Sequence, residues 1–171
     1  MTGEIHEECG VFGVCAAGVK NVAATVYAGL YALQHRGQES CGIAVARDGR
    51  LQMHKDLGQV SEVFTPSVLA RLPEGDMAVG HVRYGTTGAN ERDNAQPLLT
   101  KHRSCTMALA HNGNLVNAAS LRARLERGGA IFHTTSDSEL ISYIITRESL
   151  TAGSIELAVA NAMKTLDGAY S

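Results

Sequence analysis

A β-hairpin signal constrains the fold of this 171-residue chain more than any other feature. Two strand-like runs, residues 41–47 and 51–55, are joined by Asp48-Gly49. An Asp-Gly pair between such runs favours the tight turns with positive φ angles that connect antiparallel neighbours. The chain is therefore expected to contain an antiparallel pair of strands.

The spacing of apolar residues predicts further strands and helices. Apolar residues near a 3.6-residue period indicate a helix, and short apolar runs bounded by turn residues indicate strands. Asn117 is placed to cap a helix that Gly128-Gly129 would end. Strands and helices together predict a mixed chain with sheet and helix layers. The other expected strands are 11–17, 77–84, 105–110 and the beginning of one at 169–171; the expected helices are 21–35, 118–127, one that opens at 134–140, and 154–166, with 63–72 helical or irregular.

Composition and charge exclude several classes of function. The net charge of −2 gives no reason to expect nucleic acid or an anionic membrane as a partner. Residues 1–8 carry no secretory signal, and no apolar run approaches the ~20 residues of a membrane span. We therefore expect a cytoplasmic protein. The four cysteines (Cys9, Cys15, Cys41 and Cys105) include no Cys-x-x-Cys pair, so neither disulfides nor a metal site are expected.

Several polar stretches have both an ordinary structural explanation and a chemical one. Cys9 is either a small buried apolar residue or a nucleophile. Arg83, where a predicted strand enters a loop, suits either a surface salt bridge or a bidentate grip on a carboxylate. Asn112 and Gly113 form either a plain turn or the paired side-chain and main-chain donors of an oxyanion hole. Asp137 either stabilises the first turn of a helix or binds an ammonium group.

Five stretches, in this order, resemble the glutaminase domain of class II (N-terminal nucleophile) glutamine amidotransferases. They extend from about Glu8 to Tyr143, which is nearly the whole chain. Tyr84 and the Thr-Thr-Gly that follows after Gly85 favour the branch that serves purine synthesis over the branch that makes glucosamine 6-phosphate. The stretches are ECGVFG (8–13), LQHRGQESCGIA (33–44), GHVRYGTTG (80–88), LAHNGNLVNA (109–118) and TTSDSE (134–139).

The resemblance implies a role for Cys9 as the first residue of the mature chain. Residues 1–8 would be a propeptide, and residues 9–171 the glutaminase domain. The α-amino group of Cys9 would then be the general base, which it cannot be while it is an amide. The Asn112 side chain and the Gly113 N–H would hold the oxyanion.

The resemblance also implies how glutamine binds. Arg83 would bind its α-carboxylate and Asp137 its α-ammonium group, and the segment with Thr86 would fold over it. Arg36 would position the nucleophile or support closure. The resemblance assigns no definite role to His81 or Tyr84. His81 is expected to be a packed strand residue.

The expected function is hydrolysis of glutamine to glutamate and ammonia. In the purine branch, a phosphoribosyltransferase domain uses the ammonia to make 5-phosphoribosylamine in the first step of purine synthesis. That domain, its Mg²⁺ and any 4Fe-4S cluster would lie outside this chain, so no cofactor is expected within it. The alternatives are an unprocessed, catalytically silent precursor or glutamine-binding module, or another class II amidotransferase.

The fold implied is α+β, the four-layer αββα sandwich of N-terminal nucleophile hydrolases. We expect that domain to need further strands after residues 168–171, so it would be truncated at its C-terminus. A sheet left with an exposed edge can pair with another copy, so a homo-oligomer is expected.

Overall fold

The computed structural model describes residues 9–171 except 17, 19–20, 85–91 and 104. It is an α+β fold with one four-stranded sheet and two two-stranded ladders. The strands are β1 (Gly10–Cys15), β2 (Ser40–Arg47), β3 (Arg50–Leu57), β4 (Met77–Arg83), β5 (Leu98–Lys101), β6 (Thr106–Leu109), β7 (Gly113–Leu115) and β8 (Gly168–Tyr170). The helices are α1 (Val22–Ala32), α2 (Val60–Val63), α3 (Pro66–Leu69), α4 (Ala118–Arg127), α5 (Asp137–Glu148) and α6 (Ile155–Met163), and two 3₁₀ turns are η1 (Gln34–Arg36) and η2 (Arg92–Asn94).

The four-stranded sheet has the order β1-β4-β2-β3, and all of its neighbours are antiparallel. The β2–β3 hairpin is the one predicted from Asp48-Gly49, whose φ angles are 49° and 71°. Two successive positive φ angles are those of a type I′ turn, which matches the twist of the flanking strands.

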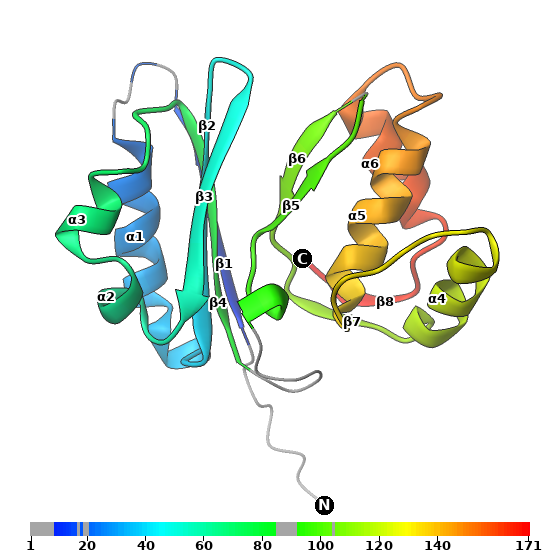
Figure 1. The fold of residues 1–171 in the computed structure, drawn as a ribbon, viewed down its shortest axis with the longest axis horizontal. Helices are drawn as coiled ribbons and strands as arrows, with labels where there is room; N and C mark the ends of the chain where they lie inside the picture. The colour runs from blue at the N-terminus through cyan, green and yellow to red at the C-terminus, as the bar shows by residue number, and fades with distance from the viewer. Residues whose placement is uncertain (1–8, 17, 19–20, 85–91, 104) are drawn as a thin grey trace, which may run out of the picture.

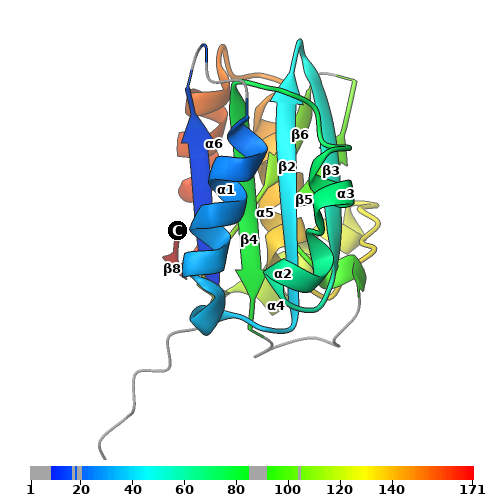
Figure 2. The same cartoon turned by 90° about the vertical axis from the view of Figure 1, so that its left-hand side faces the viewer.

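Helices cover the outer faces of the structure (Figure 1). Helices α1, α2 and α3 lie on one face of the four-stranded sheet, and Figure 2 shows α1 running across β1 and β4. The opposite face of that sheet is turned toward the β5–β6 and β7–β8 ladders, and α4, α5 and α6 lie beyond the ladders. Strand β2 is buried along most of its length because both faces of the sheet are covered.

Two separate apolar clusters hold these layers together. The first lies between α1 and the four-stranded sheet, where Val26 and Leu30 pack with Ile43 and Val82. The second lies among α4, α5, α6 and the β7–β8 ladder and includes Leu121 and Ile144. Full burial of one such side chain contributes about 1.5–3 kcal/mol.

Most predicted elements are confirmed, with informative differences. Helix α1 ends at Ala32 rather than at His35, because Gln34–Arg36 tightens into a 3₁₀ turn. The stretch 63–72, predicted as helical or irregular, contains the single-turn helix α3, which Pro66 starts, and only the last residue of α2. Strands β5 and β7 were not predicted.

Asn117 occupies the predicted N-cap position of α4 but makes no capping bond. Its amide instead donates to the carbonyl of Thr165 and accepts from the N–H of Asp167. This side chain therefore ties the start of α4 to the segment that enters β8.

Gly42 supplies a test of how closely the layers approach. A Cβ at this position would overlap the carbonyl oxygen of Gln96 and lie 2.7 Å from Cβ of Lys55. Overpacking of this kind costs about 1–3 kcal/mol, so Gly42→Ala is expected to lower the free energy of unfolding by that amount in urea titrations.

Gly13→Ala is the matched control, because its Cβ would find its nearest neighbour at 3.7 Å in the same sheet. It is expected to stay within about 0.5 kcal/mol of the parent. Equal stability of the two variants would contradict the close approach.

Candidate active site

A small polar cavity lies at the end of the four-stranded sheet where β1 begins and β4 ends. Its volume is about 40 Å³, and it contains groups from both layers of the fold. The residues lining it are Cys9, Arg83, Tyr84, Gln96, His111, Gly113, Asn114, Ser136, Asp137 and Ser138.

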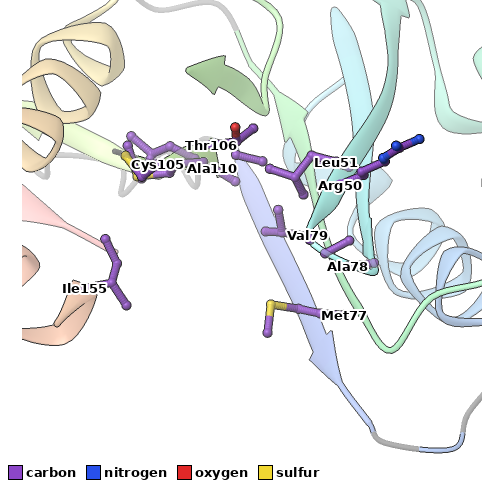
Figure 3. Close-up of a pocket in the computed structure, with 15 residues that line it drawn as sticks. Arg50, Leu51, Met77, Ala78, Val79, Cys105, Thr106, Ala110 and Ile155 are labelled. Atoms are coloured by element: carbon purple, nitrogen blue, oxygen red, sulfur yellow. The ribbon is translucent and has the colours of Figure 1, made fainter. Parts of the chain in front are cut away.

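A larger cavity of about 590 Å³ lies elsewhere, between the four-stranded sheet and β6 (Figure 3). Met77, Val79 and Leu51 line it from the sheet, and Thr106 and Ala110 line it from the other layer. Its walls are mostly apolar. Reactive and charged groups converge at the small cavity, which is therefore the candidate site.

Cys9 is held in an unusual backbone conformation beside the main chain of Tyr84. Its φ angle is 63°, in the left-handed region that a residue other than glycine seldom adopts. Its Sγ accepts from the N–H of Tyr84 at 3.3 Å and lies 3.5 Å from the carbonyl oxygen of the same residue. Strained residues of this kind gather at functional sites.

The backbone of Cys9 is fixed by two further residues. Its N–H donates to the carbonyl of Arg36 at 2.9 Å, and Nε of Arg36 donates back to the carbonyl of Cys9 at 2.7 Å. Nδ2 of Asn112 also donates to the carbonyl of Cys9, at 3.4 Å. Arg36 thus holds the backbone of Cys9 at both of its polar groups.

Gly113 presents its N–H on the side of β7 that faces away from β8. Asn112 and Ser171 exchange both of their backbone hydrogen bonds. Antiparallel pairs alternate, so the next pair, Gly113 and Tyr170, is not hydrogen-bonded, and the Gly113 N–H is directed away from β8. The φ angle of Gly113 is 130°, and a Cβ there would overlap the carbonyl oxygen of Ala169, so glycine is required.

Two charged residues complete the cavity from opposite layers. Arg83 ends β4, is 7% exposed, and lies 3.6 Å from the carboxylate of Glu39. Asp137 begins α5 after its N-cap residue Ser136. One Asp137 oxygen accepts from the N–H of Leu115 at 2.9 Å, so this carboxylate is fixed in place.

Two buried histidines lie near these charges. The ring of His111 approaches Oγ of Ser138 at 3.0 Å and the carboxylate of Asp137 at 3.6 Å. Burial lowers the pKa of His111, although the Asp137 charge opposes this shift. His81 is fully buried in β4, as expected of a packed strand residue. Burial, with smaller contributions from the charges of His111 and Arg83 and against the opposing effect of the His111 backbone, lowers the pKa of His81 to about 3.

The structure brings most of the predicted site residues together. Cys9, Arg83, Gly113 and Asp137 line the one cavity, while Asn112 and Arg36 contact the carbonyl of Cys9. Thr86 and the proposed propeptide, residues 1–8, lie outside the described residues.

Gln96, Asn114 and Ser138 also line the cavity, although no role was predicted for them. Asn114 and Ser138 lie inside the quoted motifs, whereas Gln96 lies in none of them. In the part of the chain that the structure describes, no group of three His, Cys, Asp or Glu residues could hold a metal ion. No helix there has the length and apolar character to cross a bilayer.

Comparison with known proteins defines the class of this fold and site. The sequence model of the glutamine amidotransferase domain family matches residues 66–153. The chain belongs to that family.

The relatives within this class are amidophosphoribosyltransferases, and the chain matches their glutamine amidotransferase domain. The protein of Synechococcus elongatus is 48% identical over 166 residues, which cover 97% of this chain and 33% of that protein. The Bacillus subtilis protein is 44% identical, with 98% and 34% covered. The chain thus spans about a third of the length of these curated relatives.

Solved structures agree with this assignment. The structure titled as the allosteric regulatory enzyme of purine biosynthesis has a TM-score of 0.86 and 40% identity, and the match covers 94% of this chain and 34% of that one. The glutamine phosphoribosylpyrophosphate amidotransferase of Bacillus subtilis, complexed with ADP and GMP, has a TM-score of 0.83, also with 40% identity, and 94% and 33% covered. The resemblance predicted from the sequence motifs is confirmed.

The depressed pKa of His81 predicts acid sensitivity. Between pH 6.5 and about 3 the unfolded chain binds a proton at His81 that the folded chain does not bind, so stability falls as pH decreases. The expected slope is about 1.4 kcal/mol per pH unit for this proton. Urea unfolding between pH 7 and pH 4 should show a shallower slope for His81→Leu, and parallel slopes for parent and variant would contradict the assignment.

Proposed function

We propose that this chain is a glutaminase that uses Cys9 as its nucleophile. The observation that carries the proposal is the convergence of Cys9, Arg83, Gly113 and Asp137 on one small polar cavity. A thiol, a cation, a main-chain donor and a carboxylate are the groups required to bind and attack an α-amino acid amide. The names of the relatives support glutamine as that amide.

The reaction proceeds through a thioester. The Cys9 thiolate attacks the side-chain amide carbon of glutamine, forming a tetrahedral oxyanion. Collapse of this intermediate, with a proton delivered to the nitrogen, releases ammonia, and water then hydrolyses the γ-glutamyl thioester to glutamate. The Gly113 N–H and the Asn112 amide stabilise the oxyanion in both halves of the reaction.

Binding of glutamine follows from the charges of the cavity. Arg83 pairs with the α-carboxylate of glutamine. To do so, its guanidinium gives up its contact with the carboxylate of Glu39. Asp137 pairs with the α-ammonium group through the oxygen that does not accept from Leu115. We assign closure over the substrate to the segment that contains Thr86. The cavity of about 40 Å³ must enlarge for glutamine to enter.

Removal of residues 1–8 is the step that would create the general base. A terminal amino group has a pKa of ~7.7–8.0 and a cysteine thiol one of ~8.5, so the amine can accept the thiol proton near neutral pH. The nitrogen of Cys9 already faces the carbonyl of Arg36 at 2.9 Å, and that contact would orient the freed amine. Residues 1–8 are therefore proposed as a propeptide and 9–171 as the glutaminase domain.

The remaining family properties extend this proposal. The arrangement of helices outside two strand layers supports the four-layer αββα sandwich of N-terminal nucleophile hydrolases (Figure 1). By analogy with the relatives, the ammonia goes to a phosphoribosyltransferase domain that makes 5-phosphoribosylamine. The Mg²⁺ and 4Fe-4S cluster that the resemblance implies would have their ligands outside this chain. A homo-oligomer in the cytoplasm is the expected state.

Intact mass and glutaminase activity test the proposal together. Protein that has lost the first eight residues is expected to release glutamate from glutamine, and Cys9→Ala to release none. Protein that retains residues 1–8 is expected to be inactive, as a silent precursor or glutamine-binding module. Processed protein without glutaminase activity, or activity that survives Cys9→Ala, would refute the role of Cys9.

Asn112 is expected to contribute mainly to the rate. Asn112→Ala should lower kcat by about 10²–10³-fold with a small change in KM, because the oxyanion exists after binding. Asn161→Ala on α6 is the control, since its amide accepts from Lys164 on the protein surface. A change in KM alone would place Asn112 in substrate binding instead.

A further inference from the structure

A short segment outside all of the predicted motifs contacts both halves of the candidate site. This segment, Asp93–Gln96, includes the last two residues of η2 and leads toward β5. Its two amide residues, Asn94 and Gln96, are 2% and 6% exposed, so both side chains are shielded from water.

Gln96 binds the backbone of the residue that precedes the oxyanion donors. Its Oε1 accepts from the N–H of His111 at 2.7 Å, and its Nε2 donates to the carbonyl of His111 at 3.2 Å. Both polar groups of one peptide residue are thus bound by one side chain. Asn112 and Gly113 follow His111 directly. This contact therefore fixes the position of the backbone that carries the oxyanion donors.

Asn94 binds the segment that carries the carboxylate. Its Oδ1 lies 3.3 Å from the N–H of Thr135, and its Nδ2 lies 3.3 Å from Oγ1 of the same residue. Thr135 is two residues before Asp137. Asn94 therefore fixes the segment that precedes α5, just as Gln96 fixes the segment that precedes β7.

The segment is itself fixed to the four-stranded sheet. Nζ of Lys55 on β3 donates to the carbonyls of Asp93 and Ala95, at 3.2 Å and 2.5 Å. Gly42 on β2 packs directly against the carbonyl of Gln96, with no room for a side chain. The same sheet carries Arg83 and the strand that follows Cys9, so the segment joins the two layers at the site.

We propose that Asn94 and Gln96 are positioning residues that fix the oxyanion donors and the ammonium-binding carboxylate relative to Cys9. The inference rests on the proposed glutaminase function and adds two residues to it. Neither side chain reacts with substrate: Gln96 acts through the His111 backbone, and Asn94 acts through Thr135. A displacement of about 1 Å at a reacting centre can cost about 10²-fold in rate, which is the scale of effect expected.

The two residues are expected to affect different kinetic constants. Gln96→Glu should lower kcat by roughly 10–100-fold at pH 8 with little change in KM, because the oxyanion donors are displaced. Asn94→Ala should raise KM for glutamine by about 10-fold and leave kcat within about 3-fold, because the Asp137 segment loosens.

The pH dependence of Gln96→Glu separates positioning from general damage. The glutamate keeps the acceptor for the His111 N–H but places a second acceptor against the His111 carbonyl. Protonation restores a donor at that oxygen, so the kcat deficit relative to the parent should shrink as pH falls. A merely structural defect would not recover in this way.

The kinetic test compares these variants with Asn117→Ala in protein that has lost residues 1–8. Asn117 binds two main-chain groups, of Thr165 and Asp167, away from the cavity, so its loss lowers stability and leaves both kinetic constants near those of the parent. The proposal is overturned by a Gln96→Glu deficit that is absent or constant with pH, or by an Asn94→Ala variant that matches Asn117→Ala.

Hydrogen exchange measured by mass spectrometry tests the same inference without turnover. Gln96→Glu should accelerate exchange in the peptide with residues 111–113, and Asn94→Ala in the peptide with residues 135–137. Unchanged exchange in both peptides would refute the positioning roles even if glutaminase activity is present. If the parent that has lost residues 1–8 lacks glutaminase activity but the variants show this exchange pattern, the proposed function is refuted and the positioning roles stand.

Discussion

The antiparallel pairing of β1 with β4 is the constraint that creates the site. Gly10 pairs with Val82, so the chain just before β1 meets the chain just after β4. Cys9 and Tyr84 therefore lie in contact although 75 residues separate them in sequence. The pairing of Ser40 with Arg83 brings the loop that contains Arg36 to the same end of the sheet. A register shift by one residue would turn these side chains to opposite faces.

The second layer supplies what the first sheet lacks. The first sheet brings the thiol and a cation, and the first residues of β7 and α5 bring the main-chain donor and the carboxylate. Each of these groups sits where a regular element begins or ends. Asn94 and Gln96 join the layers by binding main-chain groups of Thr135 and His111.

The sequence predicted those parts of the fold that depend on local patterns. The β2–β3 hairpin followed from Asp48-Gly49, and α5 followed from its capping residues and its apolar face. Strands β5 and β7, of four and three residues, are too short for a period of two to be recognised. The bounds of α1 and the capping of α4 were missed, since tertiary hydrogen bonds decide them.

The predicted site residues belong to motifs whose chemistry is readable from their composition. Gln96 and Asn94 were not predicted, because their partners are 15 and 41 residues away and nothing local marks an amide before a proline as structural. Likewise, the contact of His111 with Ser138 exists only in the folded chain. Residues that act through other residues leave no signal in a single sequence.

The long separation between Cys9 and Tyr84 also orders the events of folding. A strand that pairs with a neighbour some 70 positions later in the chain closes a large loop, whereas the β2–β3 hairpin closes a small one. During synthesis the N-terminal strand must wait for β4 to be made before it has an edge to join. The sulfur of Cys9 thus acquires its neighbours late, and a chain still emerging from the ribosome holds this thiol without the contacts that surround it in the folded protein.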